Sequence, residues 1–278
     1  MLRRVCTLLL FVGRRCHVRL RLLVRLKALR RAVYNLAYHK DLQGLVYRFL
    51  RNSEFQTLHD KKGYKYFSFS NLIPPSRTID EGSNKTLIIA SPDSQLIKTI
   101  SGGLAQFQDG TVCIGNMTFK VETIRVFNHD LPQDPISGST LTSGTPIVVR
   151  ISQSRLHEYG ITPKQPYNYI YWRKEYTPTA FLKQLEENLV KKFNEYYEEK
   201  LEPCQIFERL QFKKQVAVPL RMKGRQTTVI GTLWNFHFTS LNGVRRGLIQ
   251  FALDAGLGEM NSLGFGFMNL KVVETWGF

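Results

Sequence analysis

The sequence predicts an α+β fold built from two similar halves. Segments with the two-residue period of strands alternate with segments that carry an apolar stripe at helical spacing, and the same order of segments occurs twice. The chain has 278 residues, of which 43% are hydrophobic, and this length favours two domains with a core each. A stretch rich in Pro, Ser and Gly near the middle supplies the boundary.

The first half opens with a basic strand. Residues 18–26, VRLRLLVRL, alternate apolar residues with Arg for much of their length, which is typical of a half-buried strand with a basic outer face. A helix is predicted over residues 41–51, because apolar residues recur there on one helical face. KYFSFSNLI from Lys65 and TLIIA from Thr86 predict the next two strands.

A second helix and a hairpin complete this half. The helix is predicted over residues 91–107, with Ser91 as its N-cap and Pro92 in its first turn. Residues 111–127 predict the hairpin. The resulting order, β-α-β-β-α-β, is that of a ferredoxin-like (RRM-like) domain, which we predict over residues 18–130.

The second half repeats the plan after a linker predicted over residues 131–146, LPQDPISGSTLTSGTP. Its elements are a strand over 147–151, a charged amphipathic helix from Phe181, a hairpin over 215–222 and 228–240, a helix over 243–255, and a last strand from Gly264. Residues 153–176 have no clear period. We therefore predict a second ferredoxin-like domain over residues 147–278, so that the whole chain is a tandem pair.

Charge and cysteine content restrict the class of protein. The chain has 39 Lys and Arg against 22 Asp and Glu, a formal balance of +17, which indicates a polyanionic partner, most often nucleic acid and less often an acidic membrane surface. Its four cysteines are scattered and form no CxxC pair, so neither a disulfide framework nor a four-thiolate zinc site is expected. A reducing cytoplasm fits best.

Residues 1–17 are a candidate non-native extension. Arg3 and Arg4 precede an apolar run over residues 5–12, which imitates a secretory signal. The run is about half the length that spans a bilayer, and no small-x-small cleavage site follows it. The strand-like pattern begins only at Val18.

The segment AGLGEMNSLGFGFMNL near the C-terminus is rich in glycine. Gly256, Gly258, Gly264 and Gly266 free the backbone to take positive φ and to present N–H groups to a phosphate. A Rossmann fingerprint is a poor alternative, because that motif needs a strand before the glycines and a helix after them. The plain alternative, a helix C-cap at Gly256 followed by a glycine turn, stays open on spacing alone.

Three segments together resemble a known family. The loop GLGEMNSLGFGF, the helix before it and LQGLVY at residues 42–47 are similar to the repeat-associated RNA-binding superfamily of CRISPR systems. Specifically, they resemble the CRISPR-associated endoribonucleases numbered six, which cut the precursor of the guide RNA within its repeats. The resemblance covers essentially residues 18–273. It implies that CRISPR repeat RNA is the substrate and that the glycine-rich loop, with Asn261 and Ser262, contacts it.

The resemblance also implies a catalytic trio. In that family a Tyr ends the first helix, a His follows about a dozen residues later, and a Lys comes six residues after the His. Tyr47, His59 and Lys65 match these positions. Some members place the working histidine at the start of the same helix, where this chain has His39, so His39 is a second candidate.

The residues themselves are compatible with these roles without requiring them. With Leu42 taken as zero and about 100° per residue, the apolar stripe of the predicted helix is centred near 10° and Tyr47 lies near 140°. Tyr47 is therefore expected to point away from the core. His59 lies in the polar turn LHDKKG, where the alternative is a plain surface histidine. Lys65 follows two other lysines, and a solvated basic run is the alternative for any one of them.

The chemistry explains why these residue types act together. RNA is cut without a metal ion when its 2′-OH attacks the adjacent phosphorus, leaving a 2′,3′-cyclic phosphate and a 5′-OH. A histidine exchanges protons at neutral pH, a lysine stabilises the phosphorane, and a tyrosine orients it or donates to it. The six histidines show no HxxxH or HExxH spacing and no acidic cluster resembles a two-metal nuclease, so we expect no metal, no cofactor and activity in EDTA.

Binding cations are expected elsewhere on the surface. The candidates for phosphate contacts are Arg19, Arg21, Lys213, Lys214, Arg221, Lys223, Arg225, Arg245 and Arg246. Trp234, Phe236 and Phe238 alternate along one strand, which favours core packing over base stacking.

Two other interpretations remain open. A catalytically inactive relative would bind guide RNA as a subunit of an effector complex, and it would not need His59. Membrane association through the Arg-rich N-terminus is the third and weakest interpretation. Beyond repeat RNA, we count other effector subunits and a second copy of the chain as candidate partners, and we expect no membrane partner.

Overall fold

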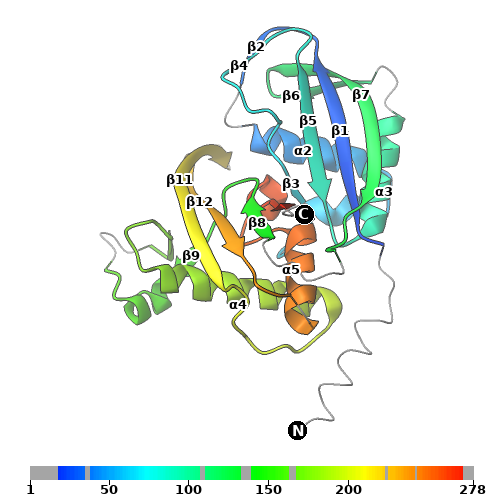
Figure 1. The fold of residues 1–278 in the computed structure, drawn as a ribbon. Helices are drawn as coiled ribbons and strands as arrows, with labels where there is room; N and C mark the ends of the chain where they lie inside the picture. The colour runs from blue at the N-terminus through cyan, green and yellow to red at the C-terminus, as the bar shows by residue number, and fades with distance from the viewer. Residues whose placement is uncertain are drawn as a thin grey trace, which may run out of the picture.

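The computed structural model describes residues 18–34, 38–106, 110–132, 139–162, 167–222, 225–241 and 243–271, and of Arg221, Met222 and Arg225 it describes only the backbone. Within these residues two units, each a sheet with helices packed on it, lie against each other (Figure 1). The predicted α+β class is therefore confirmed. In the part of the chain that is described, no helix is both long and apolar enough to span a bilayer.

The first unit has an antiparallel five-stranded sheet of order β3-β5-β1-β7-β6. Its elements are β1 (Leu20–Ala28), α2 (His39–Phe49), a 3-10 turn η1 (Gln56–His59), β3 (Ser68–Phe69), β5 (Asn84–Ala90), α3 (Ser94–Ala105), β6 (Thr111–Ile114) and β7 (Met117–Asn128). A short ribbon pairs β2 (Ala32–Val33) with β4 (Thr78–Ile79). Both helices cover the same face of the sheet, so alternate residues of β1, such as Leu22 and Val24, are buried beneath them.

The N-cap of α3 lies two residues after the predicted one. The carboxylate of Asp93 accepts hydrogen bonds from the backbone N–H groups of Gln95 and Leu96, so Asp93 is the N-cap. The Ser91 hydroxyl instead donates to the carbonyl of Tyr66. The cap predicted at Ser91 was wrong because Ser and Asp are equally good N-caps and both stand near this helix start.

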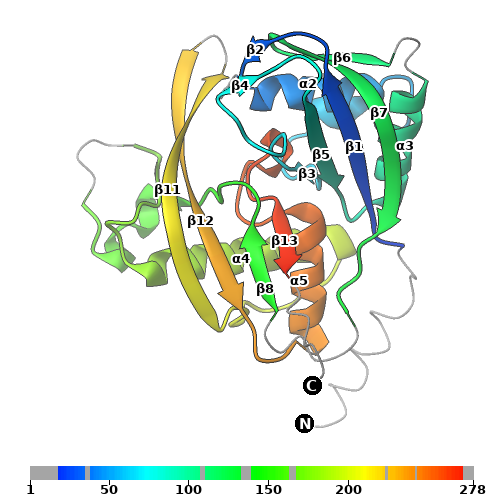
Figure 2. The same ribbon diagram turned by 45° about the horizontal axis from the view of Figure 1, so that its top comes forward.

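The second unit has an antiparallel four-stranded sheet of order β11-β12-β8-β13. Its elements are β8 (Thr140–Ser143), α4 (Pro178–Tyr197), β11 (Arg209–Met222), β12 (Arg225–His237), α5 (Gly243–Ala255), a 3-10 turn η4 (Asn261–Leu263) and β13 (Met268–Lys271). Figure 2 shows β11 and β12 as a long curved hairpin beside the shorter β8 and β13. Between β8 and α4, β9 (Arg150–Ser152) pairs with β10 (Tyr169–Tyr171), and two 3-10 turns, η2 (Gln153–Arg155) and η3 (His157–Tyr159), lie between them.

The predicted linker over residues 131–146 needs correction. Strand β8 lies inside it and pairs with both β12 and β13, so it is an inner strand of the second sheet. Its four residues, TLTS, contain one large apolar side chain, Leu141, and this is too short for a recognisable period. The strand predicted over 147–151 instead contributes two isolated bridges, from Ile147 to Thr232 and from Val148 to Glu259, and the start of β9.

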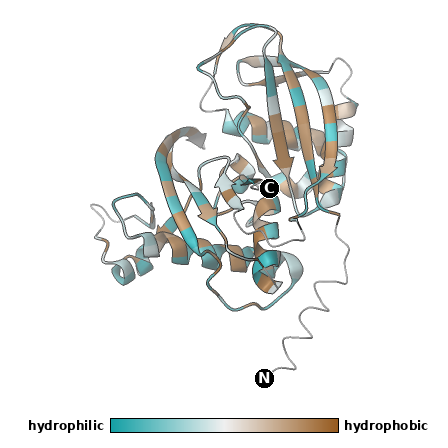
Figure 3. Ribbon diagram, viewed as in Figure 1, coloured by the Kyte–Doolittle hydropathy of each residue, from teal (hydrophilic) through white to brown (hydrophobic). Residues whose placement is uncertain are grey.

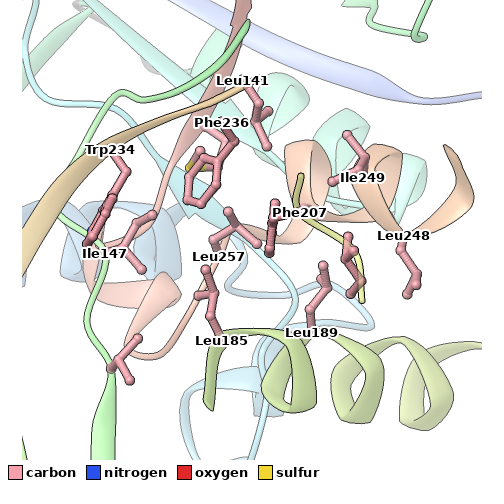
Figure 4. Packing of buried hydrophobic residues seen from close by; sticks show 14 of the residues in the cluster. Leu141, Ile147, Leu185, Leu189, Phe207, Trp234, Phe236, Leu248, Ile249 and Leu257 are labelled. Carbon is pink, nitrogen blue, oxygen red and sulfur yellow. The ribbon is translucent and has the colours of Figure 1, made fainter. Parts of the chain in front are cut away.

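The core of the second unit lies between its sheet and helices α4 and α5. Leu185 and Leu189 of α4 point toward Phe236 and Trp234 of β12 (Figure 4). Trp234, Phe236 and Phe238 are 4%, 0% and 3% exposed, so the core role predicted for them is confirmed. Along the strands, apolar and polar residues alternate as a half-buried sheet requires (Figure 3).

A buried arginine joins the two units. Arg21 of β1 is 2% exposed, and its guanidinium donates to the carbonyl oxygens of Leu253 at 2.7 Å and Met268 at 2.8 Å. It also lies 5.0 Å from the centre of the Phe267 ring. Since Arg21 is almost fully buried and its guanidinium donates to carbonyls of the second unit, the phosphate contact predicted for it was wrong. Beside it, Arg19 pairs with Asp130 and Asp254.

Candidate active site

Three side chains from the first unit meet at the end of α2. The ammonium of Lys65 donates to the Tyr47 hydroxyl at 2.9 Å and to the backbone carbonyl of His59 at 2.6 Å. The rings of Tyr47 and His59 are 5.1 Å apart between centroids and nearly perpendicular, at 83°. The predicted trio of Tyr47, His59 and Lys65 is thus a spatial cluster.

The chain between α2 and β3 brings these residues together. After α2 the backbone turns at Asn52, which has a φ of 60°, and η1 ends at His59. A second turn at Gly63, with a φ of 88°, sends the chain back toward the helix. Lys65 then closes the loop by its two hydrogen bonds.

Asp60 orients the imidazole of His59. The His59 Nδ1 lies 2.9 Å from the Asp60 carboxylate, and the His59 side chain is 68% exposed. Because a carboxylate only accepts, this contact holds the proton on Nδ1 and leaves Nε2 as the acceptor of the ring. A histidine held in this way can accept a proton at Nε2.

Burial shifts the pKa values of the other two members of the trio, Tyr47 and Lys65. It raises the pKa of Tyr47 to about 12, against an opposing interaction with the side chain of Ser262, so the phenol keeps its proton at neutral pH. Burial also lowers the pKa of Lys65, while the Asp60 carboxylate opposes this shift. The cluster therefore offers a proton acceptor, a phenolic donor and a partly desolvated cation.

The glycine-rich loop lies against this cluster from the second unit. Its ends are joined by a hydrogen bond of 2.8 Å from the N–H of Leu257 to the carbonyl of Gly266. A Cβ at Gly266 would overlap the Leu257 carbonyl, and a Cβ at Gly264 would overlap the Phe69 ring of β3. The glycines are needed for close packing at positive φ.

The backbone of the glycines is already engaged. The N–H groups of Gly256, Gly264 and Gly266 donate to the carbonyls of Ala252, Asn261 and Pro146. All four glycines of the motif, including Gly258, are buried. For these three N–H groups the direct phosphate contact predicted from the sequence was wrong, and the plain alternative of a helix C-cap at Gly256 followed by a turn is correct.

One face of α2 is hydrogen-bonded to the glycine-rich loop beside Tyr47. Gln43 donates from Nε2 to the carbonyl of Ser262 at 3.0 Å and to its hydroxyl at 3.2 Å. His39 donates from Nδ1 to the carbonyl of Leu263 at 2.8 Å. Since His39, Gln43 and Tyr47 are spaced four residues apart, they lie on one face of the helix.

His39 is separate from the trio. It is 4% exposed and stacked between the rings of Tyr38 and Phe265, at centroid distances of 4.8 and 5.0 Å. Burial lowers its pKa. The structure therefore brings His59, and not His39, together with Tyr47 and Lys65.

A cleft runs between Lys65, the one member of the trio that lines it, and the glycine-rich loop. It has a volume of about 390 Å³ and is lined by Gly63, Tyr64, Lys65, Tyr66, Arg150, Lys192, Ala255, Glu259, Met260, Asn261 and Ser262. A second hollow of about 250 Å³ continues from it and shares Tyr64, Arg150 and Glu259. Arg150 and Glu259 form an ion pair there, and the Arg150 guanidinium lies 4.7 Å from the centre of the Tyr169 ring.

The predicted binding cations have different environments. Lys213 and Lys214 are exposed where β11 has an irregularity in its register with β12. Arg245 is engaged by Glu208 and the carbonyl of Ile206, and Arg246 donates to the carbonyls of Leu131 and Pro132. The side chains of Arg221 and Arg225 and the whole of Lys223 lie outside the described residues.

Sequence reasoning missed two residues of the site. Asp60 follows His59 directly and could have been found from that adjacency. Lys192 lies among Leu185, Leu189 and Phe193 on the buried face of α4, so the signal was a lysine inside an apolar stripe. Among the described residues, no group of three or more His, Cys, Asp or Glu side chains could hold a metal ion.

Comparison with known proteins covers both units. Residues 131–270 match the family described as CRISPR associated protein Cas6, C-terminal. Over 257 residues the chain is 33% identical to the CRISPR-associated endoribonuclease Cas6 of Haloferax mediterranei, covering 90% of this chain and 93% of that protein. Over 237 residues it is 30% identical to the CRISPR-associated endoribonuclease Cas6 2 of Methanocaldococcus jannaschii, covering 82% and 90%. A solved structure described as CRISPR associated protein Cas6 shares the fold with a TM-score of 0.64 and 22% identity, over 92% of this chain and 100% of that one.

Proposed function

Because this chain belongs to the Cas6 family of CRISPR-associated endoribonucleases, we propose that it cuts CRISPR precursor RNA within the repeats by a metal-independent mechanism. The ribose 2′-OH attacks the adjacent phosphorus, the 5′-oxygen leaves, and the products carry a 2′,3′-cyclic phosphate and a 5′-OH. One observation carries this proposal: the Lys65 ammonium touches both the Tyr47 hydroxyl and the His59 backbone.

Each member of the trio has a separate role in the proposed reaction. His59, with Nδ1–H donated to Asp60, removes the proton of the 2′-OH at Nε2 and returns a proton to the leaving oxygen through water. The Lys65 cation stabilises the added negative charge of the phosphorane. The Tyr47 phenol, kept neutral by its raised pKa, donates a hydrogen bond to a phosphorane oxygen.

The two units divide the work in this proposal. Apart from the additional strands β2, β4 and β6 in the first unit and β9 and β10 in the second, each has the connection β-α-β-β-α-β and a sheet in which the last strand lies beside the first. We therefore infer a tandem pair of ferredoxin-like domains. The first supplies the trio. The second supplies the glycine-rich loop, which shapes the opposite wall of the cleft, and the exposed lysines of the β11–β12 hairpin, which contact RNA phosphates.

The test uses a repeat RNA from the genome that encodes the chain, incubated with the protein in EDTA. The expected result is one cut per repeat with a 2′,3′-cyclic phosphate and a 5′-OH, and no cut when the nucleotide before the scissile bond is 2′-deoxy. His59→Ala should cut at least about a hundredfold more slowly. His157→Ala, at an exposed histidine of η3, is the matched control and should cut at the parent rate.

Two results would contradict the proposal in different ways. Loss of cleavage on chelation would exclude the metal-independent mechanism. A parent protein that binds the repeat without cutting it would instead favour the inactive RNA-binding subunit.

A further inference from the structure

Lys192 is a buried cation that the proposed reaction does not use. It lies on the core face of α4 and is 1% exposed. Its ammonium donates to the carbonyl oxygens of Gly256 at 2.6 Å and Gly258 at 3.1 Å, and to Oδ1 of Asn261 at 3.0 Å. Three donors thus meet three acceptors, and all three acceptors belong to the glycine-rich loop.

Burying the Lys192 ammonium has a desolvation cost, which indicates that its contacts with the loop have a function. Burial lowers the pKa of Lys192 to about 7, although the Glu259 carboxylate opposes the shift. An apolar side chain would continue the stripe of Leu185 and Leu189 without that desolvation cost. What an apolar side chain cannot supply is donors to the inner carbonyls of the loop.

A short series of contacts connects the ammonium to the trio. Asn261, held by Lys192 through Oδ1, uses its Nδ2 to brace the loop by donating to the carbonyls of Leu257 and Phe265, both at 3.0 Å. The next residue, Ser262, accepts hydrogen bonds from Nε2 of Gln43, which lies one helical turn before Tyr47 on the same face of α2. Only one peptide bond therefore separates the residue held by Lys192 from the residue that is fastened to α2 beside the phenol.

We propose that Lys192 is a positioning residue for RNA cleavage: its ammonium fixes the glycine-rich loop from the buried side and so holds Ser262 against α2 beside Tyr47. This inference rests on the role proposed above for Tyr47. Without the ammonium, two carbonyls and an amide lose their donor, the loop shifts, and the phenol is no longer aimed at the phosphate. Although Lys192 is among the residues that line the cleft, its side chain is 1% exposed and the loop takes all three of its N–H donors, so it has no donor left for the RNA.

The test compares Lys192→Met, which removes the ammonium and keeps an unbranched apolar side chain, with Lys183→Met at an exposed lysine of the same helix. Single-turnover cleavage, affinity for a 2′-deoxy repeat that cannot be cut, and the melting temperature are measured for each. Lys192→Met should cut about tenfold or more slowly, because small displacements in an active site are costly. Its affinity should stay close to the parent value, and its melting temperature should fall because three loop acceptors lose their donor. Lys183→Met should match the parent in all three.

A double variant distinguishes action through Tyr47 from a separate effect. If Lys192 acts through the phenol, Lys192→Met combined with Tyr47→Phe cuts no more slowly than the slower single variant. If the two losses multiply, the proposal is wrong. If Tyr47→Phe is slow and Lys192→Met is not, the Lys192 proposal fails while the proposed function stands. If Tyr47→Phe cuts at the parent rate, the role given to Tyr47 in the proposed function fails first.

A surface variant covers the case in which Lys192→Met does not fold. Ser262→Ala removes the hydroxyl that accepts from Gln43, one helical turn from Tyr47, without changing the core. It should slow cleavage with little change in the melting temperature. Cleavage by Ser262→Ala at the parent rate would overturn the inference.

Discussion

At the scale of single residues, two histidines of the first unit differ in what surrounds them. His59 is exposed and held by Asp60, whereas His39 is stacked between two rings and donates to the Leu263 carbonyl. The sequence offered both as the working histidine. It could not decide between them, because the loop that buries His39 comes from the opposite end of the chain.

We predict that His39→Ala affects stability and that the effect depends on pH. Removing a stacked ring and the donor to Leu263 should lower the free energy of unfolding by roughly 2–4 kcal/mol at pH 8. Burial lowers the pKa of His39 below its ordinary value of 6.5. As the pH falls below 6.5, the unfolded parent binds a proton at His39 that the folded parent does not, so the free energy of unfolding of the parent decreases. The variant has no imidazole at this position and does not show this decrease.

The stability gap between the parent and His39→Ala should therefore narrow as the pH falls from 8 toward 5. Denaturant unfolding of both proteins at several pH values measures it, and every other titrating group is common to the two. A gap that is constant or widens with acid would show that His39 is protonated in the fold. His59→Ala, at an exposed residue, should leave the unfolding curve unchanged.

The buried arginine of β1 shows what residue patterns cannot resolve. Arg21 and Arg25 alternate in the same strand and point to the same face of the first sheet. Arg25 is exposed, but the second unit covers Arg21 and turns it into a donor for Leu253 and Met268. Periodicity gives the face of a side chain, and only the packing of the units says whether that face is solvated.

At the scale of elements, long periodic segments were predictable and short ones were not. The helix predicted over residues 243–255 coincides with α5, and the helix predicted over 41–51 overlaps most of α2. Strand β8 was missed, although both of its edges are paired, because four residues carry no measurable period. Its strand conformation comes from its neighbours β12 and β13, which are remote in sequence.

The glycine-rich loop gives a prediction at this scale. Gly266→Ala would place a Cβ against the Leu257 carbonyl at a φ of 67°, so both the space and the backbone conformation oppose it. The free energy of unfolding should fall by roughly 2 kcal/mol or more, and cleavage should fall with it because Ser262 moves. Gly102→Ala, in open space inside α3, is the matched control and should raise stability by up to about 1 kcal/mol. Equal unfolding curves for Gly266→Ala and the parent would mean that the loop is not held by close packing.

At the scale of the whole molecule, the formal charge of +17 is divided between cations that hold the fold and cations that face solvent. Arg21, Arg245 and Arg246 are engaged by carbonyls and carboxylates of the chain itself, whereas Lys213 and Lys214 are exposed on β11. The composition predicted an anionic partner from the total. It could not say which cations are available to that partner, since this depends on which side chains the fold uses internally.

This division predicts different salt dependences of RNA binding. Replacing Lys213 and Lys214 together by Gln removes two phosphate contacts, so the slope of log affinity against log salt should decrease by about 0.7 per contact for single-stranded RNA. Arg245→Gln with Arg246→Gln should leave that slope unchanged and lower the melting temperature instead, because these side chains fasten α5 to Glu208 and Leu131. Fluorescence anisotropy with an uncleavable 2′-deoxy repeat at several salt concentrations measures the slopes. An unchanged slope for the lysine pair would mean that the RNA follows a path away from the β11–β12 hairpin, and the cleft between Lys65 and the glycine-rich loop would then have to hold the strand by itself.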